Sequence, residues 1–219
     1  MNSRSSADHE EKMRQVTRKI IRIDKDFAPI IKASPLCSIG RKAPKKYQRS
    51  HYEILINSII SQQLATKAAD TIIERVRGLG GGKITPEIIK DIHPTNLRGV
   101  GVSGAKARAI HELTSAVHSG DINFRKFPKM ANHEISKELT ALWGIGRWTV
   151  EMFLMFHLGR LDVWPVGDLA MRRGWEKIHR LRKGIEPKKL DVIGQKFEGF
   201  QSVVAWYCWR ATEGDSSNW

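Results

Sequence analysis

Residues 142–149 read Leu-Trp-Gly-Ile-Gly-Arg-Trp-Thr, and this stretch decides the fold that we expect. Gly144 can adopt a positive φ without steric cost, so it can end the helix that precedes it. Gly146 then opens a second helix, whose first backbone N–H groups have no partner inside the helix. Since neither glycine carries a side chain, a phosphate can approach these N–H groups and the positive end of the helix dipole. The stretch therefore predicts a hairpin between two helices, over about residues 139–158, that can hold a nucleic-acid backbone regardless of its sequence.

A Gly-x-Gly turn alone is also typical of an ordinary helix cap. The loop that follows it gives further evidence on function. Pro165 and Gly167 impose an irregular backbone there and leave Asp168 at a turn directly before a further helix. Asp commonly caps a helix in this position. That structural role is compatible with a chemical one, because the N–H groups at a helix start stabilise a charged carboxylate. Both interpretations of Asp168 stay open at this point.

The rest of the chain is patterned as helices. Tyr52, Leu55, Ile56 and Ile59 follow the spacing of one buried helix face, and patterns that alternate every second residue are scarce. The sequence therefore predicts an all-α protein. Further helices are expected around residues 105–118, 134–142, 148–158, 169–180, 187–198 and 202–211.

Composition limits the partners and the cofactors. The 219 residues include 37 Lys and Arg against 23 Asp and Glu, a formal charge of +14, which suits a polyanion but also fits a merely basic enzyme. Cys37 and Cys208 lie far apart without a Cys-x-x-Cys motif, which excludes an iron–sulfur cluster on four thiolates and a Cys-based zinc site.

The chain also lacks the patterns of membrane and secreted proteins. No apolar run of about 18 residues occurs, so we expect no membrane span. The polar start lacks the apolar core of a secretion signal, and we expect an intracellular protein. Residues 1–18 predict a charged lead-in that frays, followed by one folded domain over residues 19–219.

The run from residue 139 to residue 173 resembles the helix–hairpin–helix DNA glycosylases, which share a hairpin, a Gly/Pro-rich loop and one Asp. Within that superfamily it is most similar to the 3-methyladenine DNA glycosylase II (alkylbase glycosylase) branch. Segments 59–65, 97–107 and 200–210 are similar to further motifs of that branch and occur in the same order. The resemblance implies a two-lobed all-α fold with the active site in the cleft between the lobes.

The resemblance also implies roles for single residues. Asp168 matches the catalytic Asp of the family. Gln63, or alternatively Gln62, matches the wedge that fills the gap left by the extruded base. Two departures put details in doubt: Gln201 replaces a frequent Arg, and Gly167 stands where some members have a second Asp. The implied base pocket consists of Trp148, Phe200 and Trp164, and the implied DNA contacts are Gly144, Ile145, Gly146, Arg147 and Thr149.

The expected activity is that of a monofunctional DNA glycosylase of base excision repair, which acts on double-stranded DNA with alkylated bases. Purines of the 3-methyladenine and 7-methylguanine type carry positive charge, so the base leaves without a proton and a carboxylate need only stabilise the sugar cation. The base must first be flipped out of the duplex. Aromatic walls suit a flat cation. Excision of another base (uracil, hypoxanthine or mismatched adenine) and a catalytically silent DNA-binding protein remain alternatives.

The same resemblance sets expectations about cofactors and strand cleavage. It implies no required cofactor and no metal-ligating side chains, but an alkali-metal ion, Na⁺ or K⁺, at the hairpin carbonyls. Bifunctional relatives place a Lys two residues after the second hairpin glycine, where this chain has Trp148. We therefore expect no strand-cleaving lyase activity, since an indole cannot form a Schiff base. We expect a monomer.

Overall fold

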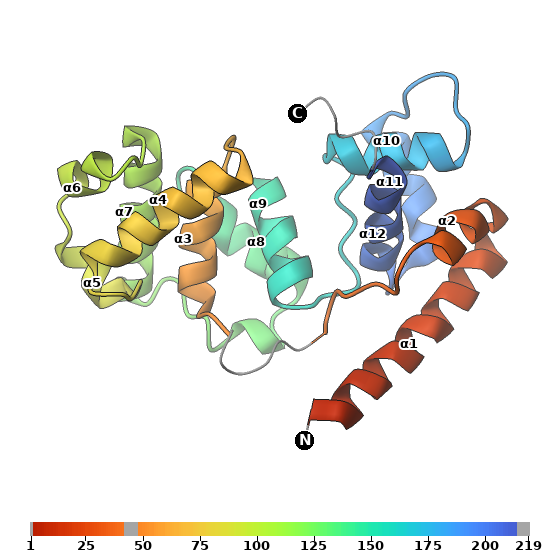
Figure 1. Cartoon of the computed structure of the whole chain (residues 1–219), viewed down its shortest axis with the longest axis horizontal. Coiled ribbons are helices and arrows are strands. Elements are labelled where there is room, and N and C mark those ends of the chain that lie inside the picture. Colours follow the sequence, from red (N-terminus) through yellow and green to blue (C-terminus); the bar gives the residue numbers. More distant parts are fainter. Residues whose placement is uncertain (1, 42–47, 214–219) are drawn as a thin grey trace. The chain divides into compact units, whose positions relative to one another are not determined.

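The computed structural model describes residues 2–41 and 48–213, and none of these residues forms a β-strand. The prediction of an all-α protein is confirmed (Figure 1). The chain divides into two compact units. We call residues 1–46 and 154–219 unit 1, and residues 47–153 unit 2.

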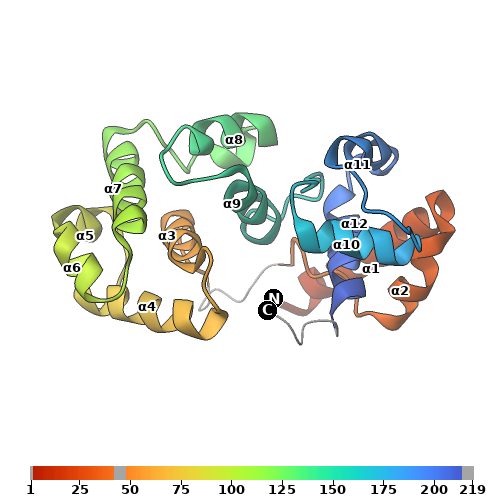
Figure 2. The same ribbon diagram turned by 90° about the horizontal axis from the view of Figure 1, so that it is seen from above.

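Unit 2 is built around α3 (His51–Ser61), whose apolar face is fully buried. Ser50 begins this helix by accepting a hydrogen bond from the Glu53 N–H, as an N-cap does. The helix packs against α4 and α7, and Figure 2 shows it enclosed by its neighbours. The other elements of unit 2 are α4 (Thr66–Leu79), α5 (Pro86–Asp91), α6 (Pro94–Gly99), α7 (Gly104–Ser119), η3 (Phe127–Lys129), α8 (Asn132–Thr140) and α9 (Arg147–Met152).

Unit 1 combines the two ends of the chain around the pair α10 (Leu169–Ile178) and α12 (Gln201–Thr212). These two helices pack so closely that a Cβ on Gly174 would lie 1.8 Å from the Cys208 carbonyl oxygen. The π-helix η4 (Phe153–His157) continues α9 and leads the chain into this unit. The remaining elements are α1 (Asn2–Ile23), η1 (Lys25–Phe27), α2 (Ala28–Ala33), α11 (Pro187–Gly194) and η5 (Gln195–Phe197).

The N-terminal segment differs from the expectation. The predicted boundary between a frayed lead-in and a domain, after residue 18, falls inside the continuous helix α1. Met13, Val16 and Ile20 are at most 9% exposed, and they repeat at intervals of three and four residues on one helix face. The charged residues around them occupy the solvent side of the same helix, so residues 6–18 belong to unit 1 rather than preceding it.

No helix among the described residues is long and apolar enough to cross a membrane.

Candidate functional site

The hairpin has the geometry that its glycines predict. Gly144 has a φ of 83°, the left-handed conformation, and a Cβ on it would lie 2.6 Å from the Cβ of Ala109. Gly146 caps α9 and has no atom within 4 Å of the place where its Cβ would be. Ile145, between them, is buried. The first glycine is therefore required by backbone and packing, whereas the second leaves the start of α9 open to a ligand.

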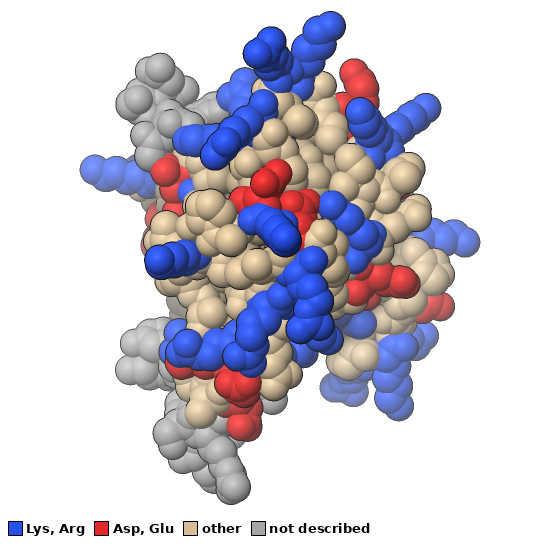
Figure 3. Space-filling model, turned by 90° about the vertical axis from the view of Figure 1, so that its right-hand side faces the viewer, with Lys and Arg blue, Asp and Glu red and all other residues tan. Residues whose placement is uncertain are grey.

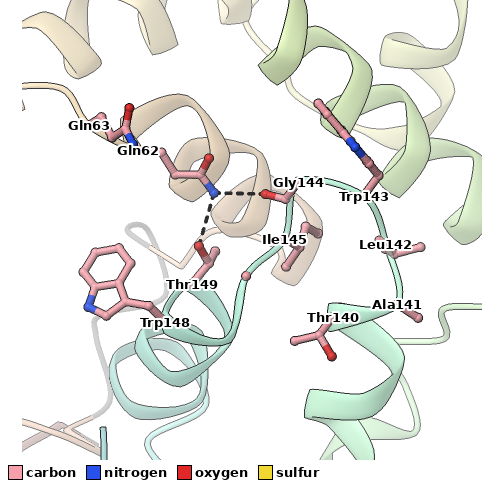
Figure 4. Close-up of a pocket in the computed structure, with 11 residues that line it drawn as sticks. Gln62, Gln63, Thr140, Ala141, Leu142, Trp143, Gly144, Ile145, Trp148 and Thr149 are labelled. Atoms are coloured by element: carbon pink, nitrogen blue, oxygen red, sulfur yellow. Dashed lines mark hydrogen bonds between the residues drawn. The ribbon is translucent and has the colours of Figure 1, made fainter. Parts of the chain in front are cut away.

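Gln62 fastens the end of α3 to this hairpin. Its Nε2 donates to the Gly144 carbonyl oxygen at 3.1 Å and to Oγ1 of Thr149 at 3.2 Å. Figure 4 shows the amide lying between α3 and the hairpin, with both hydrogen bonds drawn. The contact joins residues 82 positions apart, so it fixes the hairpin within unit 2.

Lys106, on α7, binds the C-terminal end of α3, next to the Gln62 contact with the hairpin. Its Nζ donates to the carbonyl oxygen of Ile60 at 2.9 Å, near the end of α3, and to that of the C-cap residue Gln62 at 2.8 Å. A cation at a helix C-terminus is stabilising there. Burial lowers the pKa of the Lys106 ammonium.

Gln63 is presented differently from Gln62. Its φ is 55°, which is uncommon for a residue with a side chain, and the residue is exposed. It makes neither of the hydrogen bonds that hold Gln62 to the hairpin. Strained, exposed residues concentrate at functional sites.

These residues surround a hollow of 720 Å³ in unit 2 (Figure 4). Trp148 lies at its edge with half of its surface exposed. Arg147 pairs with Glu151 at 2.8 Å but keeps 70% of its side chain exposed. The lining comprises Gln62, Gln63, Thr140, Ala141, Leu142, Trp143, Gly144, Ile145, Gly146, Trp148 and Thr149, so every hairpin residue assigned to DNA except Arg147 lies there.

Asp168 lies in unit 1 and is partly buried. Its Oδ1 accepts the backbone N–H of Met171 at 2.7 Å, which makes it the N-cap of α10, as the sequence allows. The same oxygen accepts Nε1–H of Trp209 at 2.9 Å. Trp209 belongs to α12 and reaches Asp168 because α10 and α12 pack so closely at Gly174.

The loop before Asp168 is tied to α12 as well. Ser202 accepts a hydrogen bond from the Val163 N–H at 3.0 Å and donates one to the Val163 carbonyl oxygen at 3.1 Å. Its backbone N–H donates to Leu161 at 2.9 Å. The loop that presents Asp168 therefore has a fixed backbone on its N-terminal side.

An aromatic pair stands beside this carboxylate. The rings of Phe156 and Trp209 lie 5.7 Å apart, and Phe156 is 54% exposed. The sequence analysis assigned a role to neither of these two residues. Trp209 lies within segment 200–210, which carried the resemblance, whereas Phe156 has no signal beyond an apolar residue in a helix.

Two residues assigned to the base pocket, Trp164 and Phe200, lie in unit 1, as Asp168 does. Trp164 is 9% exposed, donates from Nε1 to the Leu190 carbonyl oxygen at 3.0 Å and packs against Gly194, so it belongs to the core of unit 1. Phe200 is partly buried at the N-cap of α12, with its ring 6.2 Å from that of Phe197. Trp164 therefore exposes little of its indole, and its assignment to the base pocket stays a prediction.

Comparison with known proteins gives a consistent result. Residues 56–197 match the family described as "HhH-GPD superfamily base excision DNA repair protein". The chain is 36% identical over 182 residues to DNA-3-methyladenine glycosylase 1 of Schizosaccharomyces pombe, covering 80% of this chain and 79% of that protein.

Solved structures agree as well. The DNA-3-methyladenine glycosidase of Bacillus halodurans superposes with a TM-score of 0.81 at 31% identity, over 93% of this chain and 92% of the other. The 3-methyladenine DNA glycosylase Mag1 of S. pombe, solved with abasic DNA, gives a TM-score of 0.76 at 31% identity, over 91% and 97%. The chain belongs to the HhH-GPD superfamily of base excision DNA repair proteins.

Proposed function

We propose that this protein is a DNA glycosylase that hydrolyses the N-glycosidic bond of alkylated purines, of the 3-methyladenine and 7-methylguanine type, in double-stranded DNA. The names of its relatives support the substrate class. The observation that carries the proposal is the carboxylate of Asp168, partly buried at a helix start and bonded by two N–H donors.

The reaction needs one carboxylate. The alkylated base leaves C1′ with the electron pair of the broken bond, which neutralises the positive charge that alkylation gave it. The sugar becomes an oxocarbenium-like cation, and the Asp168 anion stabilises this charge. Water attacks C1′ and releases its proton to solvent, leaving an abasic site.

Trp209 acts as a positioning residue in this scheme. Its Nε1–H fixes the plane of the Asp168 carboxyl group from a second helix, so the carboxylate does not depend on its own helix alone. Phe156, exposed and next to Trp209, offers a ring face to a flat cationic base, a contact of about 0.5–2 kcal/mol. Trp148 offers a second exposed aromatic surface in unit 2.

The hairpin and Gln63 are assigned to DNA. The open start of α9, with Gly146 bare, suits a backbone phosphate. Gln62 is occupied with Gly144 and Thr149, so we assign the wedge that replaces the flipped nucleotide to Gln63.

An alkali-metal ion fits the hairpin chemically. Alkali-metal ions bind oxygen ligands, and residues 140–145 line the hollow, where the Gly144 carbonyl oxygen already accepts a hydrogen bond from Gln62. Such an ion would add positive charge beside the bound phosphate. Replacing K⁺ and Na⁺ by tetramethylammonium at constant ionic strength is expected to weaken DNA binding.

We further propose that the protein is a monomer inside the cell and leaves the abasic strand intact. Lys106, the lysine that the fold brings to the end of α3, donates to two carbonyl groups rather than acting as a nucleophile. Borohydride should trap no protein–DNA adduct, and an adduct that disappears in Lys106→Gln would contradict this assignment.

The direct test is incubation of the purified protein with methylated duplex DNA and identification of the bases released. Release of 3-methyladenine and 7-methylguanine supports the proposal. Release only from duplexes with uracil, hypoxanthine or mismatched adenine would point to another base. DNA binding without release of any base would indicate a catalytically silent DNA-binding protein.

A further inference from the structure

The positive charge of this protein lies mainly on the unit that lacks the hairpin. Unit 1 carries 23 Lys and Arg against 13 Asp and Glu, whereas unit 2 carries 14 against 10. The net charges are therefore +10 and +4. Figure 3 shows a face of unit 1 from which many Lys and Arg side chains project, with fewer acidic ones between them. Phosphate binding at the hairpin alone does not explain this distribution.

Six of these ten net charges lie in one segment that runs from α10 to η5. Residues 172–196 contain nine Lys and Arg and three Asp and Glu. Within this segment we define a basic ridge, whose five members are all exposed and take part in none of the ion pairs found among the described residues. The basic ridge consists of Arg180, Arg182, Lys183, Lys188 and Lys189.

The loop that carries the ridge has a fixed backbone. Ile185 is buried, and its N–H donates to Oε1 of Glu176 at 2.8 Å. The Leu181 N–H donates to the Glu176 carbonyl oxygen at 2.9 Å. The loop borders a hollow of 590 Å³, whose lining includes Arg182, Lys183 and Lys189. Three of the five cations therefore border one hollow, and the loop between α10 and α11 that carries Arg182 and Lys183 is held by backbone hydrogen bonds.

The stability of unit 1 gives no reason for this cluster. Lys188 and Lys189 follow the N-cap residue Glu186 in the first turn of α11, and that turn itself contains no acidic residue. Cations near a helix N-terminus oppose the helix dipole. The nearby carboxylate of Asp24 is already bonded to Lys196 and His179. Residues that oppose the helix dipole without an evident gain in stability are candidates for a functional role.

We propose that the basic ridge is a second contact surface for the phosphate backbone of duplex DNA, separate from the hairpin. DNA offers one negative charge per roughly 1.7 Å of its axis, a density that a row of exposed cations on a fixed loop matches. The ridge raises sequence-independent affinity and takes no part in the chemistry. This inference rests on the DNA partner of the proposed function but not on the base that is excised.

The test uses the full chain and an undamaged duplex of 25 base pairs. The ridge variant combines Arg182→Ala, Lys183→Ala and Lys189→Ala. Its matched control combines Arg125→Ala, Lys126→Ala and Lys129→Ala, which removes one Arg and two Lys from exposed positions of unit 2. Thermal unfolding of each variant verifies that the fold is kept, as expected for exposed positions.

The measured quantity is the slope of log K against log salt concentration, which changes by about 0.9 for each phosphate contact. The ridge variant should lose about two to three units of slope and bind at least ~10-fold more weakly in low salt, whereas the control should lose less than about one unit. Single-turnover base release from a saturating methylated duplex, measured separately, should stay at the wild-type rate in both variants.

Two results would overturn the inference: a ridge variant with the wild-type slope, which would assign the surface to another partner, or an equal loss in the control. Failure of the proposed function looks different. It would appear as no base release by the wild-type protein, whatever the salt slope.

Discussion

At the scale of single residues, Asp168 has the capping role that the sequence allowed and a second contact that the sequence did not indicate. It caps α10 through the Met171 N–H, and the same oxygen accepts a bond from Trp209. The cap could be predicted from the residue before a helix, because capping is local. The Trp209 contact spans 41 positions and depends on the close packing of α10 and α12, so no sequence pattern indicates it.

Trp209→Phe tests the positioning role. The ring and its contact with Phe156 remain, but a hydrogen bond to a charged group, about 1.5–3 kcal/mol, is lost. We expect a fall of ~10-fold in the single-turnover rate, with DNA affinity unchanged. Single-turnover kinetics and thermal unfolding measure the rate and the stability of the variant, and a slower enzyme that is also less stable would indicate a structural role only.

Gln62 and Gln63 should respond oppositely to substitution. Gln62→Ala removes two hydrogen bonds between α3 and the hairpin and should lower the free energy of unfolding by about 1–3 kcal/mol. Gln63→Gly relieves a left-handed conformation, so stability should not fall. Base release by Gln63→Gly should nevertheless slow on fully paired DNA, because the wedge is gone. Denaturant unfolding and single-turnover release measure the two effects, and wild-type release by Gln63→Gly would contradict the wedge assignment.

At the scale of elements, the two glycines predict the hairpin, but the sequence does not show that each glycine has a different structural role. The sequence shows Gly-x-Gly, whereas the structure shows that Gly144 is confined by Ala109 and that Gly146 is open. The helix after the hairpin was predicted as one element over 148–158, but it changes from α9 to the π-helix η4 at Phe153. Apolar spacing does not distinguish these two helix types.

The two glycines give a matched pair of variants. Gly144→Ala forces a positive φ on a side chain and a 2.6 Å contact with Ala109, so we expect a loss of about 2–4 kcal/mol in stability. Gly146→Ala meets no atom within 4 Å and should fold normally. It should still weaken DNA binding, since its methyl group stands where a phosphate approaches the N–H groups. Equal stability of the two variants would show that the hairpin is not held as described.

At the scale of the whole molecule, unit 1 shows what sequence reasoning could not reach. It is assembled from residues at both ends of the chain, and the order of helices does not reveal that closure. Asp24, after α1, bonds to His179 at 3.0 Å and Lys196 at 2.9 Å, and so joins the two ends. Helix α1 also runs across the expected boundary at residue 18, because charge content says little about which face of a helix is covered.

The Asp24 contacts predict how unit 1 responds to acid. Burial acts to raise the pKa of Asp24, but hydrogen bonds from His179 and Lys196 outweigh it and hold the pKa below its ordinary value of 3.8. A lowered pKa gives stability that is present above pH 4 and lost as pH falls through the folded value. Asp24→Asn should therefore be less stable at pH 7, by about 1–3 kcal/mol, and its stability should vary less with pH below about 4. Unfolding curves from pH 2 to 7 test this, and parallel curves for both proteins would contradict it.

The central claim is that the charge of Asp168 drives base release, and Asp168→Asn tests it most directly. Asn retains an oxygen that can cap α10 and accept from Trp209, so the fold and DNA affinity should persist while the charge is lost. The matched control is Asp162→Asn, an exposed acid of the same loop. Single-turnover release of 3-methyladenine from methylated duplex DNA should slow by about 10²–10³-fold in Asp168→Asn and stay unchanged in the control. Release at the wild-type rate by Asp168→Asn would contradict the account.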